Sequence, residues 1–101
     1  MWCWGQNTYG QMGDGTGTGR TIPVRVGTAT DWSAVGVGSF HSCGVRAHTT
    51  WCWGWNAGGQ LGDGTTTNRS APVRVGTKAD WYEVDGGYSH TVGWRNVPAG
   101  E

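Results

Sequence analysis

The chain has 101 residues, the length of one ordinary domain, with 20 Gly, 8 Trp, 3 Pro and as many Lys and Arg as Asp and Glu residues. The glycine content disfavours helices, the tryptophans argue against disorder, and the absence of a three-residue glycine period excludes collagen. The balanced charge removes the electrostatic basis for nucleic acid or an anionic membrane as a partner, and no apolar run approaches the roughly 18 residues of a membrane span.

A phrase beginning WCWG and ending GDGT occurs twice in the chain. Residues 2–46 and 51–95 align without a gap at an offset of 49 residues, and 26 of the 45 aligned positions are identical. Such agreement identifies an internal tandem repeat, which decides the fold of the whole chain. We assign the first repeat to residues 1–49 and the second to residues 50–101.

Each repeat divides into four short segments that we interpret as antiparallel strands. The first repeat has an aromatic triplet at 2–4, a glycine-flanked segment at 10–13, an alternating segment at 22–27 and a final segment at 35–45. The second repeat has the same order at 51–53, 59–62, 71–76 and 84–92. Alternation and glycine-rich turns are typical of short strands, and the proline of the third segment favours a sheet edge.

Four short antiparallel strands in a period of about 40–50 residues are typical of a β-propeller blade. A blade is a small twisted sheet with two apolar faces, which it buries by stacking against neighbouring blades around an axis. The sequence therefore predicts an all-β fold with two blade equivalents per chain.

Three segments carry a resemblance to a known family: GSFHS at 38–42, WCWG at 51–54 and GQLG at 59–62. They resemble the regulator of chromosome condensation repeat, whose pattern is G-x-x-H-T/S, then an aromatic-x-W-G, then N-x-x-G-Q-L-G, and both repeats show it. The resemblance implies a propeller, usually of seven blades, in which the G-x-x-H-T strand is innermost. Members include a nucleotide-exchange factor for a small GTPase, a plant ultraviolet-B receptor and a bacterial β-lactamase inhibitor, so the fold does not define the function.

The resemblance also implies how the blades are divided along the chain. We expect three outer strands of one blade over 2–27, one complete blade over 35–76 and one inner strand over 84–95. The two ends are then complementary parts of one blade, and Met1 looks like an added start codon on an excised or permuted segment. We therefore expect oligomerisation to complete the propeller.

Two blades per chain require an even number of blades in a closed ring, so we expect the chain to form a trimer or a tetramer with itself. The bulky Phe40, Tyr88 and Trp94, which we place on the inner strands, favour the wider tetrameric ring.

Six residues that recur at equivalent positions are interpreted as structural. The histidines hold the turns beside them, and the tryptophan rings pack between blades. These residues are Trp2, Trp4, Trp51, Trp53, His41 and His90. The G-W-R-H-T motif of the plant receptor has no Trp-Arg pair at the equivalent positions here, which argues against light sensing.

No metal, cofactor or catalytic site is expected. The Asp-Gly-Thr loops beginning at Asp14 and Asp63 lack the alternating oxygen ligands and the terminal Glu of a calcium loop, and they are interpreted as capped turns. No catalytic constellation recurs, and no phosphate-binding loop is present in the sequence.

Two functions remain: a self-assembling structural unit without an evolved ligand, and a module that binds a protein partner through loops 14–20 and 63–69. The near-identity of these loops favours the structural unit. Guanine-nucleotide exchange follows only from the resemblance. The candidate partner contacts are Tyr9, Arg20, Trp55, Asn68 and Arg69.

Cys43 and Cys52 are predicted to form a cross-strand disulfide. A hairpin turning at 47–48 places them opposite each other, with Cα atoms about 4.5 Å apart. The alternative is two free thiols in a reducing cytosol, whereas a disulfide would indicate an extracellular or periplasmic location. Cys3 is expected to stay reduced, because Val92 occupies the position equivalent to Cys43.

Overall fold

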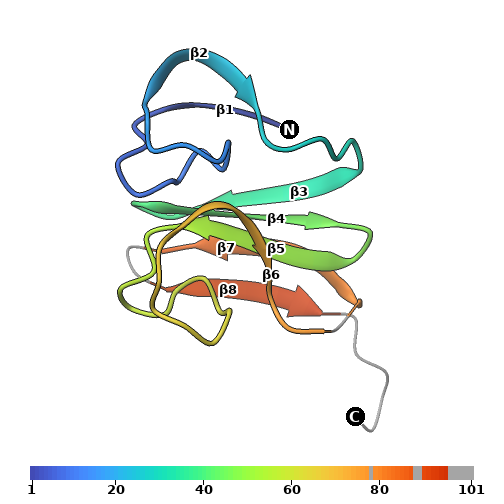
Figure 1. Cartoon of the computed structure of the whole chain (residues 1–101). Coiled ribbons are helices and arrows are strands. Elements are labelled where there is room, and N and C mark those ends of the chain that lie inside the picture. Colours follow the sequence, from blue (N-terminus) through green and yellow to red (C-terminus); the bar gives the residue numbers. More distant parts are fainter. Residues whose placement is uncertain (78, 88–89, 96–101) are drawn as a thin grey trace, which may run out of the picture.

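The computed structural model describes residues 1–77, 79–87 and 90–95, and this part of the chain contains strands and no helix (Figure 1). The strands are β1 (Trp2–Gly5), β2 (Arg20–Arg25), β3 (Trp32–Val37), β4 (His41–Arg46), β5 (Thr49–Gly54), β6 (Arg69–Arg74), β7 (Trp81–Gly86) and β8 (Thr91–Arg95). Within the described residues there is accordingly no helix that could cross a membrane.

The strands form three antiparallel sheets. The central sheet has the order β3-β4-β5-β6, and it lies between the two-stranded sheets β1-β2 and β7-β8 (Figure 1). The pairing of Cys3 with Val24 in β1-β2 repeats the pairing of Cys52 with Val73 in β5-β6. In the same way, β7-β8 repeats the register of β3-β4. The sheet β1-β2 is therefore equivalent to the outer half of the central sheet, and β7-β8 is equivalent to its inner half.

The segment 10–13 is a turn, so the expectation of a strand there is wrong. Gly10 and Gly13 have φ angles of 79° and 74°, in the left-handed region that favours glycine. The Gly10 amide donates to the Asn7 carbonyl, and the Gly13 amide donates to the Gly10 carbonyl. The equivalent segment 59–62 has the same turns. The first repeat thus supplies two outer strands, not three.

The segment 35–45 contains parts of two strands, so the expectation of one continuous strand is also wrong. The chain turns back between Val37 and His41, where the Gly38 amide donates to the His41 carbonyl at 2.8 Å. The equivalent turn lies between β7 and β8, where the Gly87 amide donates to the His90 carbonyl. The C-terminal half-blade therefore has two inner strands, not one.

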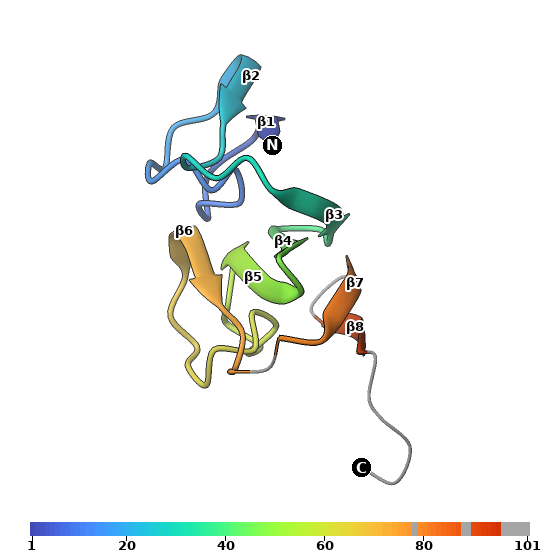
Figure 2. The ribbon, with the colours of Figure 1, turned by 90° about the vertical axis from the view of Figure 1, so that its right-hand side faces the viewer.

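The innermost strand of the blade is β3, because it is the edge strand of the central sheet that packs against β7. Figure 2 shows β6, β5, β4 and β3 following one another toward the side where β7 lies. His41 begins β4, the second strand, so the expected innermost position of the G-x-x-H segment is incorrect. The open arc of sheets is nevertheless that of adjacent blades around one axis.

The hairpin between β4 and β5 turns at Ala47 and His48, whose φ angles are 47° and 60°. Two residues in the left-handed region form a type I′ turn, which matches the twist of the strands that it connects. This turn sets Cys43 opposite Cys52, with Cα atoms 4.1 Å apart, and the structure joins the two in a disulfide. The disulfide lies in a core that includes Val45.

Titration of thiols in the denatured, non-reduced chain should find one reactive thiol. That thiol belongs to Cys3, the free cysteine of the described chain, while Cys43 and Cys52 are bonded to each other. Because the disulfide closes a short loop, it stabilises the fold by at most about 2–3 kcal/mol. Three reactive thiols per chain would contradict the bridge, and reduction with dithiothreitol provides the three-thiol reference.

Candidate functional site

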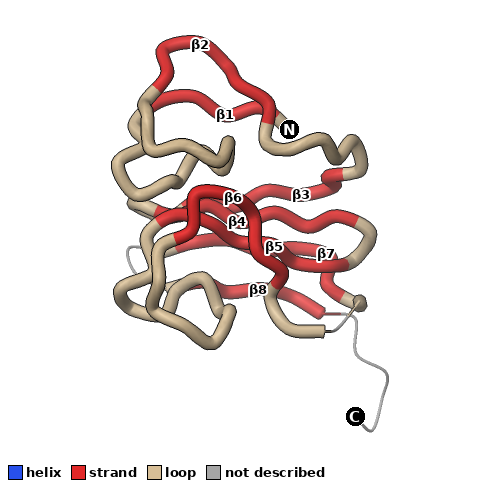
Figure 3. The backbone as a smooth tube through the Cα atoms, in the orientation of Figure 1, coloured by secondary structure: helices blue, strands red, loops and turns tan. Residues whose placement is uncertain are grey.

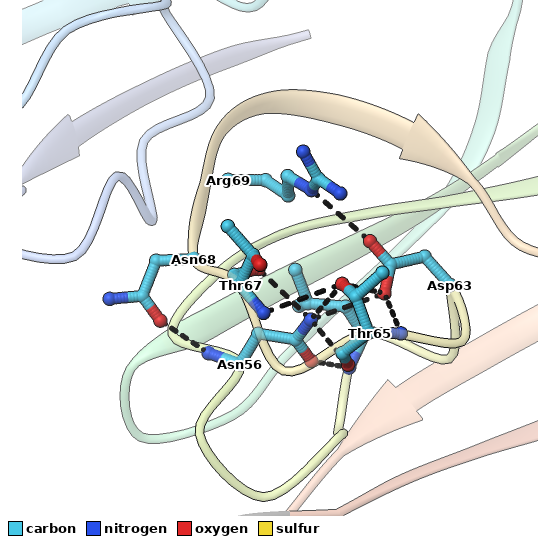
Figure 4. A network of polar contacts seen from close by, with 7 residues as sticks. Asn56, Asp63, Thr65, Thr67, Asn68 and Arg69 are labelled. Carbon is cyan, nitrogen blue, oxygen red and sulfur yellow. Dashed lines mark hydrogen bonds and ion pairs between the residues drawn. The ribbon is translucent and has the colours of Figure 1, made fainter.

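The long loop between β5 and β6 is organised around one buried asparagine side chain (Figure 4). The amide of Asn56 is fully buried and donates to the carbonyls of Thr65 and Thr67, both at 3.0 Å. It also donates to the carboxylate of Asp63 at 3.2 Å, and its own oxygen accepts from the Leu61 amide. One side chain thus fixes backbone groups on both arms of the loop.

The remaining polar side chains of this loop also bond within it (Figure 4). Asp63 accepts from the Thr65 amide at 3.0 Å and from the Thr65 hydroxyl, which is the capped turn expected from the sequence. The side-chain oxygen of Asn68 accepts from the backbone N–H of Asn56 at 2.8 Å, and Arg69 Nε lies 3.2 Å from Asp63 Oδ2. Both candidate contacts, Asn68 and Arg69, therefore also hold the loop in shape.

The first repeat builds the same loop around Asn7. Its side chain donates to the carbonyls of Thr16 and Thr18 at 2.7 and 3.1 Å, and it accepts from the Met12 amide. Figure 3 shows this loop and the loop of the second repeat on the same side of the sheets. The molecule therefore presents two similar, internally bonded loops on one face. The side chain of Arg20, another candidate contact, lies outside the described residues.

The network strongly favours the ionised form of Asp63. Burial acts to raise the pKa of this carboxyl, but hydrogen bonds from Thr65, Asn56 and Arg69 outweigh burial and lower the pKa from 3.8 to about 2. A carboxylate that accepts several hydrogen bonds is stabilised in its charged form.

Acidification should destabilise the chain between about pH 4 and about pH 2. The pKa of Asp63 is lower in the folded chain than in the unfolded chain, so its contribution is complete above the unfolded pKa and is lost as the pH falls through the folded pKa. Urea denaturation across this range measures the loss. The Asp63→Asn variant should be less stable at neutral pH and should lose less on acidification. An equal acid loss in both proteins would contradict this role.

The loops between β1 and β2 and between β5 and β6 lie on one face of the molecule, which we call the loop face (Figure 3). Three aromatic rings from two repeats form a cluster on this face. The Tyr9 ring centroid lies 5.3 Å from that of Phe40 and 5.9 Å from that of Trp55, and the latter two are 5.8 Å apart. All three side chains are partly exposed. The positions equivalent to them hold Gly58, Ser89 and Gln6, so this cluster departs from the repeat.

The cluster joins two of the candidate contacts, Tyr9 and Trp55, and adds Phe40, which the sequence analysis placed on an inner strand. Phe40 belongs to the turn between β3 and β4 and not to an inner strand, so its size does not favour a tetrameric over a trimeric propeller. Tyr88 and the side chain of Trp94 lie outside the described residues. The feature of the sequence that could have identified Phe40 as a member of the cluster is that the equivalent position in the second repeat, Ser89, is not aromatic.

His41 connects the central sheet to the C-terminal half-blade. Its ring is buried, and Nε2 lies 3.0 Å from the Thr91 hydroxyl oxygen. That hydroxyl donates to the Gln60 carbonyl, so His41 carries its proton on Nε2 and donates it to Thr91. Burial is the main cause that lowers the pKa of His41 below 6.5. The ring thus bonds across blades, whereas His90 is exposed.

The repeated tryptophans occupy three different environments. Trp53 is fully buried, and its Nε1–H donates to the Gln11 carbonyl at 2.9 Å. Trp51 is partly buried, with the guanidinium of Arg46 5.8 Å from its ring centroid. Trp2 is 61% exposed on the half-blade β1-β2, and the side chain of Trp4 lies outside the described residues. Inter-blade packing is therefore visible at Trp53.

The described residues bring no three His, Cys, Asp or Glu side chains together as a metal site. The geometry offers instead two kinds of binding surface, which are the loop face with its aromatic cluster and the edges of β1 and β8 that no described strand pairs. Both are suited to recognising protein.

A four-stranded antiparallel sheet, flanked by two sheets that repeat the registers of its outer and inner halves, defines the blades of a β-propeller. The chain belongs to the regulator of chromosome condensation (RCC1) repeat family, whose model matches residues 1–45 and 48–94. The crystal structure of human WBSCR16 has a similar fold, with a TM-score of 0.78 and 23% sequence identity. The match covers 95% of this chain and 26% of that one, so this chain spans about a quarter of that protein. No curated protein sequence matches the chain.

Proposed function

We propose that the chain is a self-assembling propeller unit whose half-blades are completed by other copies of the same chain, and that its role is structural rather than catalytic. One observation carries this proposal: β1-β2 and β7-β8 repeat the registers of β5-β6 and β3-β4. If β8 pairs with β1 of a second copy as β4 pairs with β5, the result is a four-stranded blade like the central one.

The surfaces at both ends favour this association. The outer edges of β1 and β8 are unpaired in the described chain, and free strand edges are templates for pairing with another chain. Trp2 and Val92, on these strands, are 61% and 49% exposed. One repeated interface would cover both strands and would close a ring of cyclic symmetry, with three or four chains giving six or eight blades.

The mass of the chain in solution tests the proposal. Sedimentation at micromolar concentration should give a single species of three or four times the monomer mass of 10.8 kDa. A stable monomer or dimer would contradict the closed ring, and so would a continuous distribution of larger species, which open-ended pairing would produce.

The aromatic cluster supports a second function, recognition of a protein partner by the loop face. Tyr9, Phe40 and Trp55 gather where the two repeats differ, and aromatic residues dominate binding energy at protein interfaces. A Tyr9→Ala/Trp55→Ala double variant should lose any protein that the native chain binds stoichiometrically, while Val35→Ala, on the exposed side of β3, should keep it. Retention by the double variant would exclude the cluster as the contact.

A further inference from the structure

Trp53 fills an inter-blade socket that is made by four residues of neighbouring elements. Its indole lies over Gly13, where an added Cβ would come within 2.5 Å of Nε1. Its Nε1–H donates to the Gln11 carbonyl, which also accepts from the Ser42 hydroxyl at 2.8 Å. The ring of Trp32 packs against it at a centroid distance of 5.8 Å.

The four residues at equivalent positions of the second repeat line a cavity of about 310 Å³. They are Gly62, Gln60, Thr91 and Trp81, the counterparts of Gly13, Gln11, Ser42 and Trp32. A cavity of about 150 Å³ already admits a benzene ring, so this one has room for an indole.

The walls of this cavity are already in the arrangement that surrounds Trp53. The Thr91 hydroxyl donates to the Gln60 carbonyl as Ser42 does to Gln11, and a carbonyl oxygen can accept a second hydrogen bond. The guanidinium of Arg95 lies 5.7 Å from the centroid of Trp81 and pairs with Asp80 at 2.7 Å.

Arg46 and Asp31 hold Trp32 in the same way, at 5.9 and 2.7 Å. The two sockets therefore have matching side walls, although none of the residues that the structure describes fills the second socket as Trp53 fills the first.

We propose that this cavity is a docking socket for Trp4 of a second copy of the chain. The position equivalent to Trp53 at the repeat offset is Trp4. In the central sheet Ser42 pairs with Trp53, so the same register between β8 and the β1 of another copy sets Trp4 opposite Thr91. The indole then enters over Gly62 and donates to the Gln60 carbonyl. This inference rests on the proposed assembly and names the residue that anchors it.

Two variants at position 4 test the socket by sedimentation. Trp4→Ala removes the indole and should weaken assembly at least about 30-fold, the effect of losing an interface anchor. Trp4→Phe keeps a ring without the N–H donor and should weaken assembly less. Thr66→Ala, an exchange at an exposed position of the loop between β5 and β6, should assemble like the native chain. Near-ultraviolet circular dichroism of Trp4→Ala shows whether the isolated chain keeps its fold.

Exchange of the Trp4 indole hydrogen with solvent provides a second readout. In the native assembly this hydrogen should be protected, because it is buried and bonded to Gln60. If the chain assembles but Trp4→Ala assembles equally well, or if the Trp4 indole hydrogen exchanges rapidly, the socket inference is wrong while the proposed ring stands. If the native chain stays monomeric and this hydrogen exchanges rapidly, both are wrong.

Discussion

Replacing Trp53 by alanine should lower the free energy of unfolding by about 3–5 kcal/mol. The indole is fully buried between the central sheet and the turn at Gly13, and its N–H donates to the Gln11 carbonyl. The exchange leaves a cavity at the junction of two sheets and removes this bond between them. Since small domains are stable by only about 5–15 kcal/mol, much of the stability of the fold would be lost.

Urea denaturation followed by circular dichroism measures this loss at a concentration where the chain is monomeric. Val35→Ala is the matched control, because Val35 is 55% exposed and surface exchanges usually change stability by less than about 0.5 kcal/mol. A loss of less than about 1 kcal/mol for Trp53→Ala would show that this tryptophan does not join the half-blade β1-β2 to the central sheet.

The architecture of the blades was predictable because the sequence repeats. The offset of 49 residues and the recurring Trp-x-Trp-Gly segment indicated the family and the all-β fold, which the family match and the strands confirm. The type of each segment was harder to assign. Segment 10–13 was interpreted as a short, glycine-flanked strand, but it forms turns, because its glycines adopt positive φ angles and the Asn7 side chain accepts a hydrogen bond from the Met12 amide.

The strand boundaries near the G-x-x-H segment were missed for a related reason. The segment 35–45 was expected to be one final strand of the repeat, whereas a turn closed by the Gly38 amide divides it into β3 and β4. No periodicity marks a turn of this kind, since the residues on both sides have strand character. The hairpin at 47–48 was easier, because Cys43 and Cys52 lie at equal distances from its centre.

The contacts between repeats depend on side chains that come together only in the folded chain. The sequence does not show that Phe40 contacts Tyr9 and Trp55, because each of the three is aromatic in one repeat only and the repeat pattern relates none of them to another. The bond from His41 to Thr91 likewise joins two blades, whereas local reasoning expected a bond to the adjoining turn. The repeat predicts the strands of each blade, whereas the side-chain contacts between neighbouring blades depend on how the folded blades pack.

The second large effect is expected from Val92→Cys, which places a thiol at the free edge of the C-terminal half-blade. Cys43 faces Cys52 across β4 and β5, and the equivalent positions are Val92 and Cys3. If β8 of one copy pairs with β1 of the next in this register, the new cysteine faces Cys3 of that copy. Each chain would then be bonded to its two neighbours, and the whole ring would become covalent.

Joining two thiols in a disulfide removes two electrons, so an oxidant such as diamide has to be added. Burial raises the pKa of the Cys3 thiol, which lowers the fraction of reactive thiolate and slows the reaction. Two variants serve as controls. Val92→Cys combined with Cys3→Ser has lost one partner and should not cross-link. Asp85→Cys introduces an exposed thiol on β7, opposite Val92 but one strand away from the free edge, and it should not bond to Cys3.

Denaturing, non-reducing electrophoresis of oxidised Val92→Cys is the most direct measurement of whether copies complete one another's blades. We predict that most of the protein runs as one covalent species of three or four chains, which returns to the monomer on reduction. A product that stays monomeric, an open ladder without an end point, or equal cross-linking of Asp85→Cys would contradict the proposed pairing of β8 with β1.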